Sequence, residues 1–328
     1  MGGPIQSADV TISTARLNRL LQYEPRDLTL SVEAGMPYGE LCRTLAQHRQ
    51  MIPLDPPFAA ESTIGGVLAA NLSGPRRRLY GTARDMVIGM TFATLEGKLV
   101  QTGGMVVKNV AGLDMAKMMI GSLGTLAAIA TVNFKVYPMQ SYTRTFVFRF
   151  SSVEKAMAAR DQVLTGVLQP AAIDLIKNSD GYQLLIQAGG SRPVLDRYSK
   201  ELPGAEVLEG SAEDDPWAGI REAPRDFLRE HPDGAVTTIR CGLSQVGDWL
   251  ERLPAPAIAR AGSGVVHGFF AHAEDAPGNG LIEFAPAAFR ESKTLWPDPG
   301  DDFGMMEKVK RMLDPDLLLN RRRLYGRI

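Results

Sequence analysis

Two neighbouring stretches decide the fold: TIGGVLAANLSGPRRRLYGTARDMVIGM at residues 63–90 and TGGMVVKNVAGLDMAKMMIGSLGTLAAI at residues 102–129. Turns rich in glycine, proline or hydroxyl side chains recur in and beside them, namely PLDPP (53–57), STIGG (62–66), YGTARD (80–85) and IGSLGT (120–125). Glycine lets backbone N–H groups approach a ligand because it has no Cβ, and a diphosphate or a flavin edge needs such an approach. Tight corners in a glycine-rich β domain give the same pattern, so the residues alone leave both interpretations open.

The rest of the first half alternates short strands with short helices. Residues 28–34 alternate as a strand does, and Pro37 then stands where a helix can begin, with Leu41 and Leu45 one turn apart. The other elements expected here are a capped helix at 62–72, a hairpin of 87–95 and 99–102, an apolar segment at 106–110, a helix at 114–120 and a strand at 127–136.

From residue 143 onward, strands alternate with amphipathic helices, which predicts an α+β domain. The acidic, proline-rich segment 201–233 is expected to form a loop and one surface helix. The remaining elements expected are the strand TFVFRF, a helix at 153–164, strands at 172–177, 184–187, 235–240, 264–270 and 281–284, a helix near 245–253, and a last helix at 303–313 before the tail 314–328.

The composition is that of an ordinary soluble globular protein. The 328 residues are 45% hydrophobic and 22% charged, and 36 basic against 37 acidic residues give no field that would draw the chain to nucleic acid. The distant cysteines Cys42 and Cys241 indicate a reducing compartment and cannot ligate an iron–sulfur cluster that needs four. No secretory signal or membrane-spanning run is visible, so we expect a cytoplasmic location, with peripheral attachment to the inner face of the membrane through partners as an option.

Several common catalytic motifs are missing from the sequence. There is no GxxxxGK[ST] phosphate loop and no GxSxG elbow, and the glycines at 262, 264 and 268 have the wrong spacing for a nicotinamide site. The four histidines show no HExxH spacing, so no metal site is expected.

The quoted stretches closely resemble the flavin-binding segment of the vanillyl-alcohol oxidase and p-cresol methylhydroxylase family. The tail LDPDLLLNRRRLYGRI (313–328) resembles the closing motif of that family, and the similarity runs from about Ala8 to the end. The resemblance implies an α+β fold: a two-part FAD-binding domain of the p-cresol methylhydroxylase type at 1–140, an α+β cap domain at 141–302, and a return to the FAD domain at 303–328. Because that family's flavin domain begins with a further βα unit and diphosphate loop ahead of ADVTIST, its first part is expected to be truncated here.

The resemblance also implies which residues bind non-covalent FAD. They are Pro53, Asp55 and Pro56 beside the isoalloxazine and ribityl chain, Thr63, Gly65 and Gly66 with amides near the diphosphate, Tyr80, Gly81, Thr82 and Asp85 along the adenosine–diphosphate path, and Gly121, Ser122, Gly124, Thr125 and Ile129 closing on the flavin or adenine. Asp114 is either a helix N-cap or a cofactor contact, and Arg76 to Arg78 form either a solvated turn or a partner-docking site.

The cap carries one departure from the catalytic members of the family. Where those members have a HxGDGNxH-like segment that helps hold a metal or substrate, this chain has RAGSGVVH at 260–267, which keeps only the glycines and His267. The pattern resembles the FAD-binding accessory subunit of bacterial glycolate oxidase. His267 is the candidate catalytic residue, and a buried, hydrogen-bonded strand histidine is the alternative interpretation.

The resemblance therefore implies an FAD-binding subunit of a glycolate (2-hydroxy acid) oxidase or dehydrogenase complex. Such a subunit would relay electrons alongside a catalytic flavoprotein subunit and an iron–sulfur subunit, with a small 2-hydroxy acid as substrate and no nucleic acid as partner. Two alternatives stay open: a self-sufficient FAD-dependent hydroxy-acid oxidoreductase, and a structural partner whose flavin site has decayed.

Overall fold

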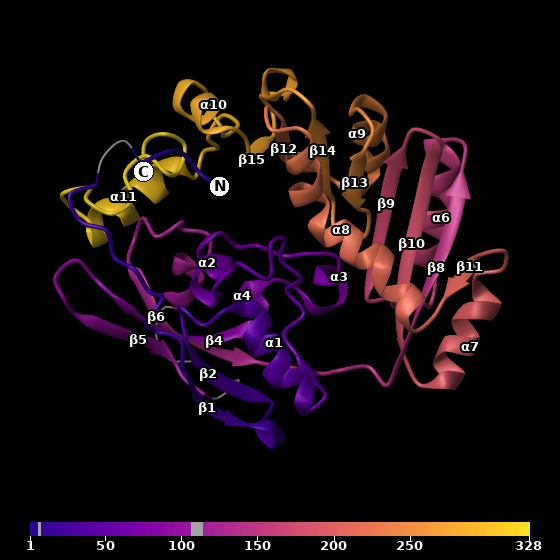
Figure 1. Cartoon of the computed structure of the whole chain (residues 1–328), viewed down its shortest axis with the longest axis horizontal. Coiled ribbons are helices and arrows are strands. Elements are labelled where there is room, and N and C mark those ends of the chain that lie inside the picture. Colours follow the sequence, from indigo (N-terminus) through magenta and orange to yellow (C-terminus); the bar gives the residue numbers. More distant parts are fainter. Residues whose placement is uncertain (6–7, 106–113) are drawn as a thin grey trace. The chain divides into compact units, whose positions relative to one another are not determined.

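A computed structural model of the chain describes residues 1–5, 8–105 and 114–328, which divide into two compact units (Figure 1). The first unit comprises residues 1–73, 81–139 and 290–328, and the second comprises residues 74–80 and 140–289. Residues 290–302, placed with the cap in the sequence analysis, thus group with the first unit, and the short segment 74–80 groups with the second.

Within the described residues, the first unit is built on a five-stranded antiparallel sheet of order β1-β2-β6-β4-β5. The cross-strand pairs Val32–Val132 and Leu30–Phe134 are fully buried and join β2 to β6 at the centre of the core. The strands of this unit are β1 (Leu20–Glu24), β2 (Thr29–Glu33), β4 (Val87–Ala93), β5 (Leu99–Gly103) and β6 (Ala128–Lys135), with β3 (Gln50–Met51) and β7 (Tyr137–Pro138) paired separately.

The helices of the first unit are α1 (Tyr38–Gln47), α2 (Ile64–Ala69), α4 (Ala83–Met86), α5 (Ala116–Met119), α11 (Phe303–Leu313) and, at the boundary between the units, α10 (Ala287–Ser292). Helices α1, α2, α5 and α11 lie where helices were predicted, whereas α4 and α10 were not predicted. The predicted helix after Pro37 is confirmed, because Leu41 and Leu45 are buried on its inner face. The predicted N-cap role of Asp114 is wrong: Met115 occupies the N-cap, and Asp114 forms an ion pair of 3.6 Å with Lys117.

Within the described residues, the second unit contains an eight-stranded antiparallel sheet of order β11-β8-β10-β9-β13-β14-β12-β15. Its strands are β8 (Tyr142–Phe150), β9 (Ala172–Asn178), β10 (Gly181–Gly190), β11 (Glu206–Leu208), β12 (Ala235–Arg240), β13 (Ala257–Arg260), β14 (Val265–Phe270) and β15 (Leu281–Phe284). Its helices are α3 (Arg77–Tyr80), α6 (Val153–Thr165), α7 (Arg192–Glu201), α8 (Ser211–Glu230) and α9 (Val246–Arg252). Short 3-10 turns lie at Pro25–Asp27, Leu243–Gln245 and Ala273–Asp275.

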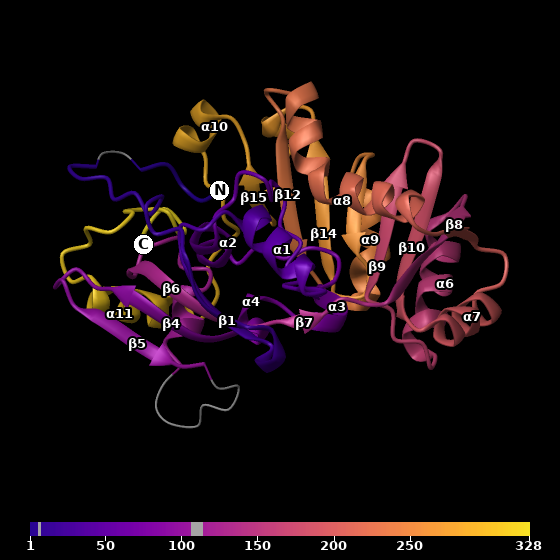
Figure 2. The same cartoon turned by 60° about the horizontal axis from the view of Figure 1, so that its bottom comes forward.

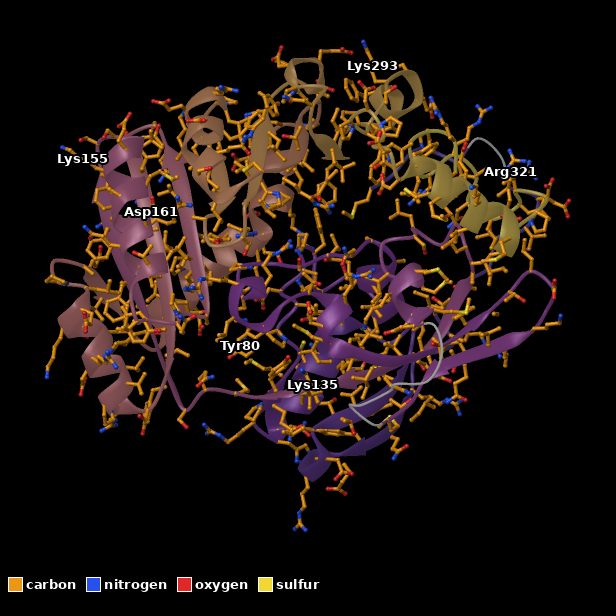
Figure 3. All side chains as sticks on the ribbon, turned by 180° about the vertical axis from the view of Figure 1, so that it is seen from behind. Tyr80, Lys135, Lys155, Asp161, Lys293 and Arg321 are labelled. Atoms are coloured by element: carbon orange, nitrogen blue, oxygen red, sulfur yellow. The ribbon has the colours of Figure 1, made fainter. Side chains whose placement is uncertain are left out.

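Both faces of this second sheet are covered by helices, as Figure 2 shows for α6 and α8 on opposite sides. Successive strand residues point to opposite faces, so Phe146 and Ile186 pack toward α6, α7 and α9, whereas Val147 and Leu185 pack toward α8. Helix α6 presents the exposed side chain of Lys155, labelled in Figure 3, on its outer surface.

The segment 201–233 differs from its prediction. The one helix expected here is present as the 20-residue α8, but the segment also contains strand β11, and Trp217 and Ile220 of the helix are buried against the sheet. Pro216 and Pro224 lie inside this helix, although proline usually ends a helix. The apolar segment predicted at 106–110, with Lys108 and Asn109 of its VKNVAG motif, lies outside the described residues. No helix among the described residues has both the length and the apolar character that a membrane crossing requires.

Candidate functional site

The loop of residues 120–125 docks on helix α2 within the first unit. The backbone N–H of Gly121 donates to the carbonyl of Leu68 at 3.0 Å, and that of Leu123 donates to Ala69 at 2.8 Å. Gly121 and Gly124 have φ of +86° and +71°, so both need glycine. The structure therefore brings together two of the predicted cofactor-binding turns, STIGG and IGSLGT, although they stand more than 50 residues apart.

Hydroxyl groups hold the shape of this loop from inside. The Ser122 hydroxyl donates to the carbonyl of Met119 at 2.8 Å, and the Thr125 hydroxyl donates to the carbonyl of Ser122 at 2.7 Å. Both side chains are buried, and Thr125 is fully so. Ser122 and Thr125 thus have a local structural role, and any contact they make with a cofactor runs through their backbone.

The C-terminal tail fastens the loop from the other side. Lys310 on α11 donates through Nζ to the carbonyl of Thr125 at 2.7 Å and to that of Leu319 at 3.0 Å, and it forms a buried ion pair with Asp314. The Asn320 side-chain amide donates to the carbonyl of Leu123 at 2.8 Å. The ion pair of Lys310 with Asp314 was not predicted, although a lysine four residues before an aspartate at a helix end is typical of such a pair.

Asp314 completes this arrangement. Burial alone would raise its pKa, but the hydrogen bonds from Lys310 and from the backbone N–H groups of Leu318 and Leu319 lower the pKa below its ordinary value. Both backbone bonds measure 2.8 Å. The carboxylate therefore stays charged at neutral pH and holds the first turn of the tail.

Helix α2 begins as predicted, but its glycines act differently. Thr63 is the N-cap, and its hydroxyl oxygen accepts from the N–H of Gly66 at 3.2 Å. The N–H of Gly65 donates to the carbonyl of Ala34 at 2.6 Å, so the predicted role of this amide near a diphosphate is wrong. Gly65 is needed for packing instead, because a Cβ there would lie 3.0 Å from the Cβ of Ala34.

The predicted residues at 80–85 fall on both sides of the unit boundary. Tyr80 belongs to the second unit, where its hydroxyl accepts from the Gln140 amide at 3.1 Å. In the first unit the carboxylate of Asp85 accepts from the backbone N–H of Thr82 at 2.8 Å and from its hydroxyl at 3.1 Å. Gly81 has φ of +81°, and a Cβ there would overlap the Asp85 carboxylate. Thr82 and Asp85 therefore cap helix α4, and their contact with a cofactor stays a prediction.

The remaining predicted residues of the first unit are buried. Pro53, Asp55 and Pro56 lie in the loop after β3, where Asp55 has φ of +48°. Ile129 pairs with Phe92 across β6 and β4 and is 7% exposed. Their predicted contacts with the flavin stay predictions.

One residue that the sequence analysis missed brings a buried acceptor without a donor to the docked loop. Asn71 follows α2 with φ of +52°, and its side-chain oxygen is buried without a donor among the described residues. Gly121 is its neighbour, since a Cβ on that glycine would lie 3.5 Å from the Asn71 Cβ. A buried acceptor without a donor is costly, and a ribityl hydroxyl or a ring N–H of FAD is the kind of group that satisfies it.

The second unit gathers charged groups around His267 on strand β14. The His267 Nδ1 lies 2.9 Å from the hydroxyl of Thr238 on the neighbouring strand β12. Burial first, and then the positive charges of Arg260 and Arg77, lower the pKa of His267 to about 3. The imidazole is therefore neutral at physiological pH, in a field that favours anions.

Arg260 is itself only partly neutralised. It forms a buried ion pair with Asp174 on β9, but its Nε is buried without an acceptor among the described residues. Glu283 on β15 adds a carboxyl group whose pKa is raised by burial, against a hydrogen bond from Thr238 and the charges of Arg240 and Arg260. In the part of the chain that the structure describes, no three His, Cys, Asp or Glu side chains come together as a metal site would require.

Comparison with known proteins identifies relatives that bind FAD or oxidise hydroxy acids. Residues 1–103 match a family model described as an FAD binding domain. The chain is 31% identical over 229 residues to the glycolate oxidase subunit GlcE of Escherichia coli K12, a match that covers 70% of this chain and 62% of that protein. It is 29% identical over 213 residues to a D-lactate dehydrogenase of Anaerostipes hadrus, which covers 63% of this chain and 42% of that protein.

A solved structure of alkyldihydroxyacetonephosphate synthase shares the fold, with a TM-score of 0.65 at 22% identity over 94% of this chain and 67% of that chain. The predicted fold class, an α+β FAD-binding fold of the p-cresol methylhydroxylase type with a further α+β part, is confirmed, and FAD is the cofactor. The chain spans less than two thirds of the length of the curated relatives to which it is compared here.

Proposed function

We propose that this chain, whose residues 1–103 belong to the FAD binding domain family, is the FAD-binding subunit of a complex that oxidises a 2-hydroxy acid such as glycolate. It holds FAD non-covalently and relays electrons to partner subunits. Bound FAD supplies the two-electron acceptor that converts a hydroxy acid to an oxo acid. The names of the relatives support the substrate class, since glycolate and D-lactate are both 2-hydroxy acids.

The observation that carries the accessory role is the state of His267. A general base works best when its pKa lies near the operating pH, and the pKa of His267 is lowered to about 3. Such an imidazole is a weak acceptor for the proton of an α-hydroxyl group. This favours a chain that depends on a partner for substrate oxidation, with His267 and Thr238 as groups that position rather than deprotonate.

The partners that we propose are a catalytic flavoprotein subunit and an iron–sulfur subunit. The Escherichia coli relative is itself a subunit, which supports an assembly. Two cysteines in the whole chain are too few for a cluster of its own, so onward electron transfer needs another protein, a quinone or oxygen.

The second candidate function is a self-sufficient hydroxy-acid oxidoreductase. The observation in its favour is the cationic surrounding of His267, because Arg260 and Arg77 would attract the carboxylate of a hydroxy acid.

Anaerobic flavin reduction separates the two. The FAD-loaded chain is mixed with glycolate or D-lactate, alone and together with the catalytic flavoprotein subunit, and the visible absorption band of oxidised flavin is followed. We expect bleaching of this chain's flavin only when the partner is present. Bleaching at the same rate without the partner would establish the self-sufficient enzyme, and no bleaching in either case would leave a structural subunit.

A further inference from the structure

Two arginines of the first unit have buried nitrogen atoms that lack acceptors. Arg290 lies in α10 and Arg323 in the C-terminal tail, and in each the guanidinium Nε is buried without a hydrogen-bond acceptor among the described residues. The two charges also lie close enough to interact: burial first, and then the charge of Arg290, lower the pKa of Arg323. In the described part of the chain, no carboxylate forms an ion pair with either side chain.

This combination is unfavourable for the protein alone. A buried donor without an acceptor loses its bonds to water and gains none in return, and two like charges repel each other in a medium of low dielectric constant. An anion between the guanidinium groups would relieve both costs at once. Arginine suits phosphate oxygens in particular, because its planar donors can form two parallel charge-assisted hydrogen bonds.

Arg323 is held in place by its backbone. Its carbonyl accepts from the N–H of Gly3 at 2.9 Å, and its own N–H donates to the carbonyl of Asn320 at 3.3 Å. Asn320 in turn is bonded to Leu123 of the loop that docks on α2. The backbone that carries this guanidinium is therefore held by hydrogen bonds on both sides.

The surroundings of Arg323 are the glycine-rich parts of the same unit. Gly2 has φ of +70°, and a Cβ there would lie 3.3 Å from the Arg323 Nε and 2.7 Å from a methyl carbon of Leu123. The guanidinium thus lies beside the Gly2–Gly3 backbone and beside the loop that carries Gly121 and Gly124. At Gly2 the space that a side chain would need is filled by Leu123 and Arg323, so glycine allows these segments to pack closely around the guanidinium.

We propose that Arg290 and Arg323 bind the diphosphate of FAD. The inference rests on FAD as the cofactor of this fold, and it adds to the proposed function two residues outside the segment 1–103 that matches the FAD-binding family. A diphosphate carries one negative charge for each guanidinium. Free inorganic phosphate shares this chemistry and is the alternative occupant that the experiment must separate.

The test is equilibrium binding to the flavin-free full-length chain, with FAD, ADP, riboflavin and inorganic phosphate as probes. Arg323→Gln and Arg290→Gln are compared with Arg322→Gln, an exposed neighbour in the same tail. Arg321, labelled in Figure 3, serves less well as the control because its Nε donates to the carbonyl of Leu317. Loss of a charged hydrogen bond should weaken FAD and ADP by about ten- to a hundredfold, while riboflavin, which lacks the diphosphate, changes by less than about twofold.

Three results would overturn the proposal. FAD affinity could be the same in Arg323→Gln and Arg322→Gln, riboflavin binding could fall as far as FAD binding, or phosphate binding alone could be lost. If Arg323→Gln does not fold, Arg323→Lys keeps a positive charge without the planar fork, and it should bind FAD more weakly than the wild type with an unchanged melting temperature. Unchanged FAD affinity in that variant also contradicts the proposal. None of these results bears on partner-dependent flavin reduction, so failure here is distinguishable from failure of the proposed function.

Discussion

The two units each contain a buried ion pair, and the pairs differ in how completely their polar atoms are satisfied. In the first unit, Lys310 is 2% exposed and Asp314 fully buried, and Lys310 Nζ donates to two carbonyls besides the carboxylate. In the second unit, Arg260 is 9% exposed and Asp174 fully buried, yet the Arg260 Nε has no acceptor among the described residues. Lys310 thus makes its hydrogen bonds within the fold, whereas Arg260 keeps a donor without an acceptor in the described part of the chain.

This difference distinguishes a charge that only stabilises the fold from a charge that can also act on a ligand. Lys310 ties together α11, the loop around Thr125 and the start of the tail, and each of its donors has a partner within the unit. Arg260 instead contributes to lowering the pKa of His267, one strand away. Buried cations that lack part of their hydrogen bonding, such as Arg260, Arg290 and Arg323, are therefore where we expect anionic ligands.

The largest expected effect on stability comes from breaking the Lys310–Asp314 ion pair. Lys310→Met leaves Asp314 buried without its cation and frees the carbonyl of Thr125, so we expect a loss of about 3–5 kcal/mol in the free energy of unfolding. Urea denaturation of the flavin-free chain measures it. Lys308→Met, an exposed lysine on the same helix, is the matched control and should change stability by less than about 0.5 kcal/mol. Equal stability of the two variants would show that the pair does not hold the tail.

Replacing both members of each ion pair with apolar residues compares the contributions of the two pairs to stability. Arg260→Leu with Asp174→Leu removes a pair that is only partly satisfied, and we expect the free energy of unfolding to change by less than about 1 kcal/mol. Lys310→Met with Asp314→Leu should still cost about 2 kcal/mol or more, because two carbonyls and two backbone N–H groups lose their partners. The same denaturation assay applies, and a reversed order of the two double variants would contradict our distinction.

A smaller effect on the free energy of unfolding is expected when the pH is lowered, because burial lowers the pKa of His267 in the folded chain. Unfolded histidine has a pKa of about 6.5, while the folded pKa of His267 is about 3. Between these values the unfolded chain binds the extra proton, so stability should fall as the pH falls, by up to about 1.4 kcal/mol per pH unit. His267→Asn, which cannot titrate, should lose stability less steeply across this window in parallel denaturation curves. Parallel slopes for the two proteins would mean that His267 titrates normally in the folded state.

The sequence predicted those elements whose signals are local. Helix α11 has the predicted bounds, and the hairpin of β4 and β5 and the strand β14 lie within one or two residues of theirs, because periodicity and turn residues mark them directly. The glycine and hydroxyl residues of STIGG and IGSLGT likewise marked two turns, and the structure brings the second of them against the helix that begins in the first. Helix α8 shows the limit: the sequence predicted one surface helix in 201–233, but not that Trp217 and Ile220 pack it against the sheet despite its two internal prolines.

The remaining features depend on contacts that no local pattern encodes. Asp174 and Arg260 are 86 residues apart and meet only because β9 and β13 are neighbours in the sheet. The short strand β13 went unpredicted, because AIAR is too brief to show an alternation. The Gly65 amide was assigned to a ligand because the sequence does not show the carbonyl of Ala34, its actual partner.

The distinction between the two units is tested by the FAD content of the purified chain and of the Arg260→Leu, Asp174→Leu double variant, measured as flavin released on denaturation. We propose that the diphosphate of FAD binds in the first unit, which also holds the Lys310–Asp314 pair, and that the charged cluster of the second unit binds an anionic substrate or a partner. We therefore expect stoichiometric FAD in both proteins. Loss of FAD from the double variant while it remains folded would contradict this proposal, because the partly satisfied pair of the second unit would then belong to the cofactor site.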